Sequence, residues 1–171
     1  MISSQMTENK DNLAQYERNE RYLGEQLFIR IPTIKEYEFT SGRICFDSLV
    51  TTTENKHILV EIKVRRFRRE RYNTYILQVD KLQNLIKRAE KMKLEEIRYI
   101  NFFESDNPAK VEFIIFNLSE RIKQWQKKPP KVEKMKMNIE TWKSEDVKAL
   151  KDIILLEFDD KIDSKGDFYL N

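Results

Sequence analysis

Residues 57–65 show the strictest alternation of apolar and polar side chains in the chain, and they limit the folds that it can adopt. One parity is apolar throughout and consists of Ile58, Val60, Ile62 and Val64. Because successive side chains of a strand point to opposite faces, this pattern predicts a β-strand with one buried face. The chain therefore needs a sheet and further elements that cover this face.

A second alternating segment, residues 43–50, precedes this strand, and the polar stretch 51–56 lies between the two. This arrangement predicts an antiparallel hairpin. The apolar faces of the two strands must lie on the same side, so the numbers of paired residues must add up to an even number. A turn centred on Glu54 makes this sum 108 and sets Asp47 directly opposite Glu61. Cβ atoms of such a pair lie about 4.5–5.5 Å apart.

The remaining segments alternate between helical and extended patterns. The predicted elements are helices at 13–28 and 74–92 and strands at 28–39, 97–103 and 111–118, in addition to the two hairpin strands. This order, α-β-β-β-α-β-β, is typical of an α/β fold in which helices flank a mixed β-sheet. We expect one domain, with a flexible leader at 1–12, a core at 13–118 and a short C-terminal extension at 119–171 that is packed on the core or appended to it. In that extension, 119–128 is expected to be a short helix, and 153–158 fits either a helix or a strand.

Scarce residue types exclude several kinds of site. The chain has three glycines, one histidine and one cysteine among its 171 residues. Three dispersed glycines cannot form a phosphate-binding loop, and one His with one Cys cannot form a Cys- or His-rich zinc site. The chemistry must therefore come mainly from carboxylates and amines. The N-terminus has no signal-peptide pattern and no segment is apolar enough to span a membrane, so we expect a cytoplasmic protein.

Asp47, followed by Glu61-Ile62-Lys63 on the predicted hairpin and then by a helix, resembles the PD-(D/E)XK nuclease superfamily of restriction-endonuclease-like enzymes, of the bacterial or phage type. Phe46 stands where members of that family often have proline. The resemblance covers about residues 13–118. It implies a restriction-endonuclease-like core and a nuclease that binds Mg²⁺, or Mn²⁺ as a substitute, through Asp47, Glu61 and the carbonyl of Ile62.

The same resemblance implies roles for further residues. Lys63 would assist the attacking water. Glu20 on the first helix would complete the catalytic set, with Glu17 as the alternative. Gln78 and Lys81 on the second helix would contact phosphate or water. These roles agree with the chemistry, because Mg²⁺ binds one or two carboxylates and promotes phosphodiester hydrolysis.

Positive charge is concentrated just after the predicted site. Residues 63–93 contain eleven Lys or Arg against three Asp or Glu, a net charge of +8, so the rest of the chain carries −5 of the total of +3. Such a cluster favours a polyanion as the partner, and the resemblance implies DNA rather than RNA. A homodimer is compatible with this interpretation. The residues predicted to contact the nucleic-acid backbone are Arg65, Arg66, Arg68, Arg69, Arg71 and Lys81.

Three other interpretations remain open. Asp47, Glu61 and Lys63 also fit a solvated sheet face with a cross-strand ion pair. The basic cluster fits a nucleic-acid-binding or assembly protein of the same fold without catalytic activity. Phe67, Tyr72 and the C-terminal tryptophans fit a protein-interaction module. Metal binding that is lost when Asp47 is replaced would distinguish the nuclease from these alternatives.

Overall fold

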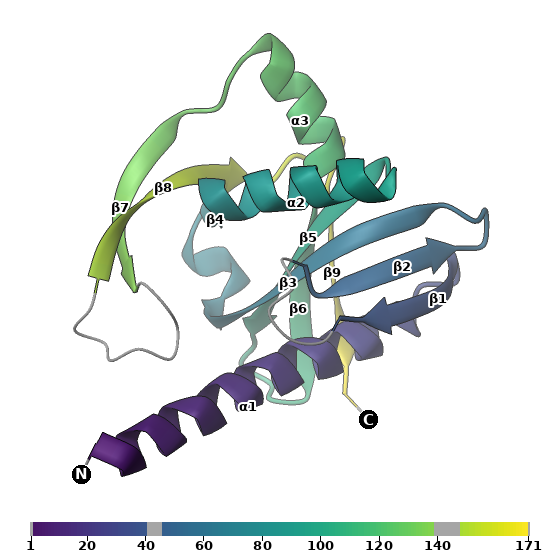
Figure 1. The fold of residues 1–171 in the computed structure, drawn as a ribbon. Coiled ribbons are helices and arrows are strands. Elements are labelled where there is room, and N and C mark those ends of the chain that lie inside the picture. The colour runs from purple at the N-terminus through teal and green to yellow at the C-terminus, as the bar shows by residue number, and fades with distance from the viewer. Residues whose placement is uncertain (1, 41–45, 139–147, 171) are drawn as a thin grey trace.

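The fold is given by a computed structural model, which describes the backbone of residues 2–40, 46–138 and 148–170 (Figure 1). Side chains of the first helix are described from Gln15 onward. The elements, in chain order, are α1 (Ile2–Phe28), β1 (Ile34–Phe39), β2 (Ser48–Thr52), β3 (His57–Arg68), a 3₁₀ turn (Arg69–Arg71), β4 (Thr74–Gln78), α2 (Val79–Met92), β5 (Glu96–Glu104), β6 (Lys110–Asn117), α3 (Leu118–Lys127), β7 (Val132–Asn138), β8 (Lys148–Glu157) and β9 (Ser164–Tyr169).

Two sheets organise these elements into a mixed α/β fold. The main sheet has six strands in the order β1-β2-β3-β5-β6-β9. Its β3–β5 pair is parallel, whereas the other neighbouring pairs are antiparallel. A smaller antiparallel sheet has the order β4-β8-β7. Among the residues described, no helix combines the length and the apolar character that crossing a membrane requires.

The hairpin register predicted from the sequence is confirmed. The paired residues of β2 and β3 have numbers that add up to 108, from Ser48 opposite Val60 to Thr51 opposite His57. The turn between the strands contains Asn55 in the left-handed region, with a φ of 59°. The earlier part of the predicted first strand, residues 41–45, lies outside the described residues, and with it Cys45.

The prediction that β3 has only one buried face is wrong. Val60 and Ile62 pack in a core with Leu27 and Phe28 of α1. Leu59, on the opposite face, belongs to a second core, which includes side chains of α2 and of the small sheet. Glu61, also on that second face, is completely buried. Both faces of the strand are therefore covered, as is usual where parallel pairing lies in the centre of a sheet.

Helix α1 approaches the main sheet closely because one of its contact positions is a glycine. A Cβ atom at Gly24 would lie 2.7 Å from Cδ1 of Ile62 on β3, so the end of the Ile62 side chain would have to shift to make room for it. The helix also begins much earlier than predicted. It starts at Ile2, and not at residue 13, so the segment predicted to be a flexible leader is helical from there. Residues 2–23 contain no proline or glycine to interrupt a helix.

Helix α2 is shorter than predicted, because residues 74–78 form β4 instead of its first turns. Tyr75 therefore belongs to a strand and not to the helix. The buried stripe of α2 consists of Leu82, Leu85 and Ala89. At the C-terminal end, Lys93 adopts a left-handed conformation, and its N–H bonds the last carbonyls of the helix.

The C-terminal region is part of the sheets rather than an appendage. Strand β9 pairs with β6 in the main sheet, and β8 pairs with β4 in the small sheet. Residues 153–157, for which the sequence left helix and strand open, belong to strand β8. The predicted short helix is confirmed as α3. In Figure 1, β7 and β8 curve away from the body of the molecule on the same side as the N-terminal half of α1.

Helix α3 provides a test of local stability. The side-chain oxygen of Asn117 accepts a hydrogen bond from the N–H of Glu120 at 3.2 Å and caps the helix. Asn117→Ala should lower the free energy of unfolding by about 1 kcal/mol. Urea denaturation measures this change. Gln126→Ala, on the exposed surface of the same helix, should stay within about 0.5 kcal/mol of the wild type. Equal stability of all three proteins would contradict the capping role.

Candidate active site

Four of the residues predicted from the sequence, which come from α1, from the segment before β2 and from β3, converge at one place. Nζ of Lys63 lies 3.3 Å from Oε1 of Glu61 and 3.2 Å from Oε1 of Glu20. Asp47 lies just before β2, close enough to influence the ionisation of both glutamates. Of the two acidic candidates on α1, the structure places Glu20 in the cluster, whereas Glu17 is exposed.

The backbone of β3 connects Asp47 to Glu61. Oδ2 of Asp47 accepts a hydrogen bond from the N–H of Ile62 at 2.7 Å. Because the N–H and C=O of one strand residue point to the same side, the carbonyl of Ile62 faces the side of Asp47 as well. The carboxylate of Asp47 and the carbonyl of Ile62 thus lie next to Glu61.

Glu61 is the most unusual group of the cluster. Its side chain has no exposed surface, and neither carboxylate oxygen has a well-aligned hydrogen-bond donor among the described residues. Nζ of Lys81 lies 2.8 Å from Oε1 of Glu61, so an ion pair with this ammonium balances the negative charge of the carboxylate. Burial raises the pKa of Glu61 to about 7; Lys63 and Lys81 oppose this shift, and Asp47 adds to it.

The neighbouring groups respond in the same way to burial and charge. Burial also raises the pKa of Glu20, with Lys63 opposing the shift. Burial alone would lower the pKa of Lys63, but the carboxylates of Glu61, Glu20 and Asp47 outweigh it and raise the pKa above its usual value. Lys63 is therefore a permanent ammonium group. Its side chain is 36% exposed and is accessible to a substrate.

The donor set suits a hard divalent cation. Asp47 and Glu61 supply two carboxylates, and the Ile62 carbonyl supplies a third oxygen. Mg²⁺ typically uses one or two carboxylates and completes its shell with water and phosphate oxygens. Within the described part of the chain, no three His, Cys, Asp or Glu side chains gather around one point. A cation would therefore depend on the two carboxylates and the carbonyl.

A small cavity of about 70 Å³ opens beside Glu61 and Lys63. It is also lined by Arg65, Gln78, Lys81, Tyr99 and Met137. Gln78 was predicted to lie on a helix, but it is the last residue of β4, immediately before α2. Lys81, which was predicted to bind nucleic acid, lines the cavity and contacts Glu61 directly.

Sequence reasoning missed the residues that reach this cavity from the C-terminal region. Nζ of Lys151 on β8 donates to Oε1 of Gln78 at 3.0 Å. Met137 on β7 lines the cavity itself. Neither residue belongs to a motif, and both come from strands far along the chain from the hairpin. Lys63 and the other motif residues carry no information about that long-range packing.

Arg65 was predicted to contact nucleic acid and is held rigidly beside the cavity. Its Nε donates to Oδ1 of Asn101 at 2.7 Å. Its Nη2 donates to the hydroxyl of Tyr99 at 2.6 Å and to the carbonyl of Ile76 at 3.0 Å. Since three acceptors fix one edge of the guanidinium, the group is pre-organised for an anion.

The other predicted arginines differ in their surroundings. Arg66 stacks on the ring of Tyr16, with 4.7 Å between its Cζ and the ring centroid. Arg68 is exposed and pairs with Asp106. Arg71 is also exposed. Arg69 is different, because its side chain is only 20% exposed and donates to the carbonyl of Gly166 at 3.1 Å.

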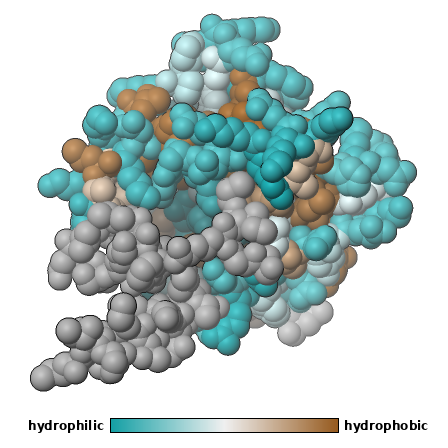
Figure 2. All heavy atoms as spheres, viewed as in Figure 1, coloured by the Kyte–Doolittle hydropathy of each residue, from teal (hydrophilic) through white to brown (hydrophobic). Residues whose placement is uncertain are grey.

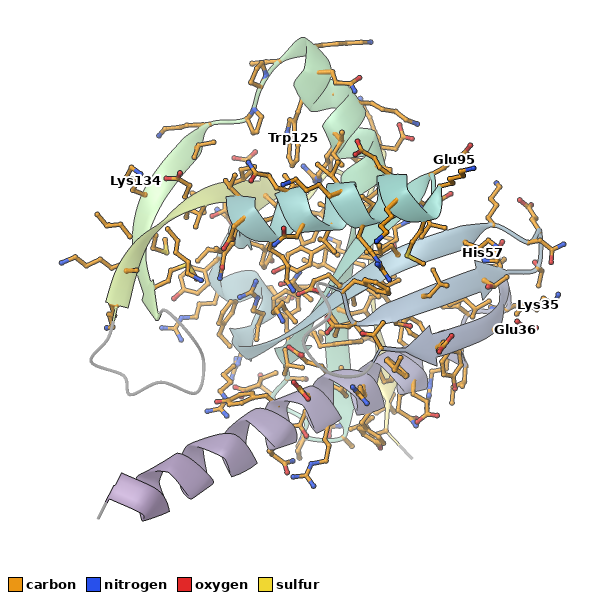
Figure 3. All side chains as sticks on the ribbon, in the orientation of Figure 1. Lys35, Glu36, His57, Glu95, Trp125 and Lys134 are labelled. Carbon is orange, nitrogen blue, oxygen red and sulfur yellow. The ribbon has the colours of Figure 1, made fainter. Side chains whose placement is uncertain are left out.

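His57 lies away from these groups. It is at the start of β3, and Figure 3 shows it with Lys35 and Glu36 at the end of the hairpin that points away from β7 and β8. Its Nδ1 lies 3.0 Å from the hydroxyl of Thr51.

The chain matches no protein-family profile, and no curated protein matches it. In structure it is similar to Hjc, a Holliday junction resolvase from the archaeal hyperthermophile Archaeoglobus fulgidus, with a TM-score of 0.43 and 11% sequence identity. That alignment covers 78% of this chain and 86% of the resolvase.

Proposed function

We propose that the protein is a Mg²⁺-dependent nuclease that hydrolyses phosphodiester bonds in DNA. One observation carries the proposal: acidic and basic side chains from α1, from the segment before β2 and from β3 converge, and the two from β3, Glu61 and Lys63, line a small cavity. The resemblance of these residues to the PD-(D/E)XK motif supports the same assignment and a restriction-endonuclease-like core. The residues are Glu20, Asp47, Glu61 and Lys63.

Each residue has a role that its surroundings support. Asp47, Glu61 and the Ile62 carbonyl would hold Mg²⁺, or Mn²⁺ in its place. When bound, the ion neutralises phosphate charge and helps a water molecule to ionise. The ammonium of Lys63 donates hydrogen bonds to the attacking water or to the phosphate oxygens, where negative charge develops. Glu20 holds that ammonium in position.

The surrounding positive charge would bind the DNA backbone. Arg65 and Lys81 line the cavity, and Gln78 borders it at the N-terminal end of α2. The exposed side chains of Arg66, Arg68 and Arg71 extend this positive charge away from the cavity. Contacts of this kind position a phosphate chain without reading its sequence. A homodimer would place two such sites for cleavage of both strands of a duplex.

Metal dependence is the first test. Purified protein should cut plasmid DNA with Mg²⁺ or Mn²⁺ and should not cut it in EDTA. Asp47→Asn keeps an oxygen that accepts from Ile62 but removes the charge, so calorimetric titration with Mg²⁺ should show that ion binding is lost. Glu36→Gln, on the exposed face of β1, is the matched control and should bind normally. Cleavage in EDTA would reject the mechanism.

A nucleic-acid-binding protein without hydrolytic activity is the second candidate. The observation that favours it is the position of Lys63 and Lys81, which already balance the buried charge of Glu61 without a metal. This alternative predicts DNA binding that weakens with salt, is unaffected by Asp47→Asn, and is not accompanied by measurable uptake of Mg²⁺.

A further inference from the structure

An apolar pocket of about 400 Å³ lies next to the catalytic cavity. Its volume is within the range of about 300–1,000 Å³ that is usual for small-molecule sites. The two hollows share Arg65 and Ile76 as lining residues. The pocket is otherwise lined mainly by aromatic and apolar side chains, namely Phe67, Tyr72, Tyr75, Met135 and Leu155.

One wall of the pocket comes from an arm formed by β7 and β8 (132–138 and 148–157). On β7, Met135 lines the apolar pocket and Met137 lines the catalytic cavity. Lys151 lies directly opposite Met135 and reaches Gln78, so these side chains share the inner face of the arm. Lys134 is exposed and points outward in Figure 3. Figure 2 shows hydrophobic patches among mainly hydrophilic residues in the region of this arm.

The opposite wall presents an aromatic ring to solvent. Tyr72 is 47% exposed, and its ring lies edge-on to Phe67 at 5.0 Å between centroids. The guanidinium of Arg71 lies 5.3 Å from the centre of the Tyr72 ring. Aromatic rings and methionine side chains are surfaces on which a flat base can stack.

A second surface hollow lies on the other side of Phe67, which lines both this hollow and the apolar pocket. It is lined by Arg66, Arg68 and Arg71, together with two glutamates, Glu70 and Glu104. The apolar pocket therefore lies between a catalytic cavity and an arginine-rich hollow, and it shares lining residues with both. A DNA strand fits this order of hollows, because its phosphates can contact the arginines while one of its bases enters the apolar pocket.

We infer that the apolar pocket binds one unpaired nucleobase of the DNA substrate, next to the bond that is cleaved. Arg65, which lines both hollows, would contact the phosphate between them. This inference rests on the proposed nuclease function and extends it: the preferred substrate contains an unpaired nucleotide, and a fully paired duplex is a poorer ligand. The selectivity comes from stacking on Tyr72 and Met135 and does not depend on the sequence of the DNA.

Binding in EDTA, where no cleavage occurs, tests the inference with three DNA probes. They are a paired duplex, the same duplex with one unpaired adenine, and the same duplex with an unpaired abasic residue. Fluorescence anisotropy should show that the unpaired adenine binds about tenfold more tightly than the abasic residue, a difference of about 1.4 kcal/mol. Tyr72→Ala and Met135→Ala should remove this preference and leave the affinity for the paired duplex unchanged.

Two variants serve as matched controls. Tyr169→Ala removes an aromatic ring of similar exposure on β9, and Leu150→Ala removes an exposed apolar side chain that does not line the pocket. Both should keep the preference. Equal affinity for the adenine and abasic probes, or a preference that survives in Tyr72→Ala and Met135→Ala, would overturn the inference while DNA cleavage with Mg²⁺ still supported the nuclease. No binding to any probe, together with no cleavage, would contradict both.

Discussion

DNA cleavage by Lys63→Ala should fall at least about 100- to 1,000-fold, the usual effect of removing a positioned group that stabilises developing charge. The ammonium of Lys63 lies 3.3 Å from Glu61 and 3.2 Å from Glu20, and the side chain of Lys63 is partly exposed. No other lysine among the described residues is held between two carboxylates in this cluster. Lys81 could partly balance Glu61 in the variant but would lie farther from Glu20.

The initial rate of plasmid cleavage in Mg²⁺ measures this effect. Circular dichroism and the melting temperature should show that the variant is folded, because Glu61 can take up a proton when it loses its partner. Lys56→Ala is the matched control, since Lys56 is an exposed lysine near the hairpin turn that pairs with Glu54. A cleavage rate for Lys63→Ala close to that of Lys56→Ala would show that Lys63 has no part in the reaction.

The second large effect concerns stability in EDTA. Burial raises the pKa of Glu61 from 4.5 to about 7, so the native protein holds this proton to a higher pH than the unfolded chain does. The corresponding stabilisation is complete below pH 4.5 and is lost as the pH rises through about 7. At about 1.4 kcal/mol per pKa unit, the free energy of unfolding should fall by about 3 kcal/mol over this interval. The raised pKa of Glu20 also makes the free energy of unfolding fall as the pH rises.

Comparison with Glu61→Gln isolates this contribution. Glutamine has nearly the same shape and does not titrate, so the stability of the variant should depend less on pH between 4.5 and 7. Urea denaturation at several pH values measures the free energy of unfolding of both proteins. Parallel curves for the wild type and Glu61→Gln would mean that the carboxylate of Glu61 is already ionised throughout this interval.

The local part of the site could be predicted from the sequence. The register of the β2–β3 hairpin follows from the parity of its apolar residues and the position of its turn, and both are properties of adjacent residues. That register places Asp47 beside Glu61 before any tertiary contact is considered. Helix periodicity likewise set Glu20 on α1, although it could not say which glutamate of that helix turns toward Lys63.

The long-range part could not be predicted in this way. Residues 74–78 contain apolar residues at spacings that suit both a helix and a strand. They form β4 because β8, from the C-terminal region, pairs with them. The same pairing brings Met135, Met137 and Lys151 to the site. The burial of Glu61 has the same origin, because the second face of β3 is covered by elements that come later in the chain.

Gly24 connects the packing of the fold to the chemistry of the site. It lies one helical turn after Glu20, so both residues occupy the same side of α1. Its missing side chain sets how closely the helix lies on β3, and the same spacing determines whether the carboxylate of Glu20 reaches Lys63. The absence of a side chain at Gly24 therefore influences the contact between Glu20 and Lys63.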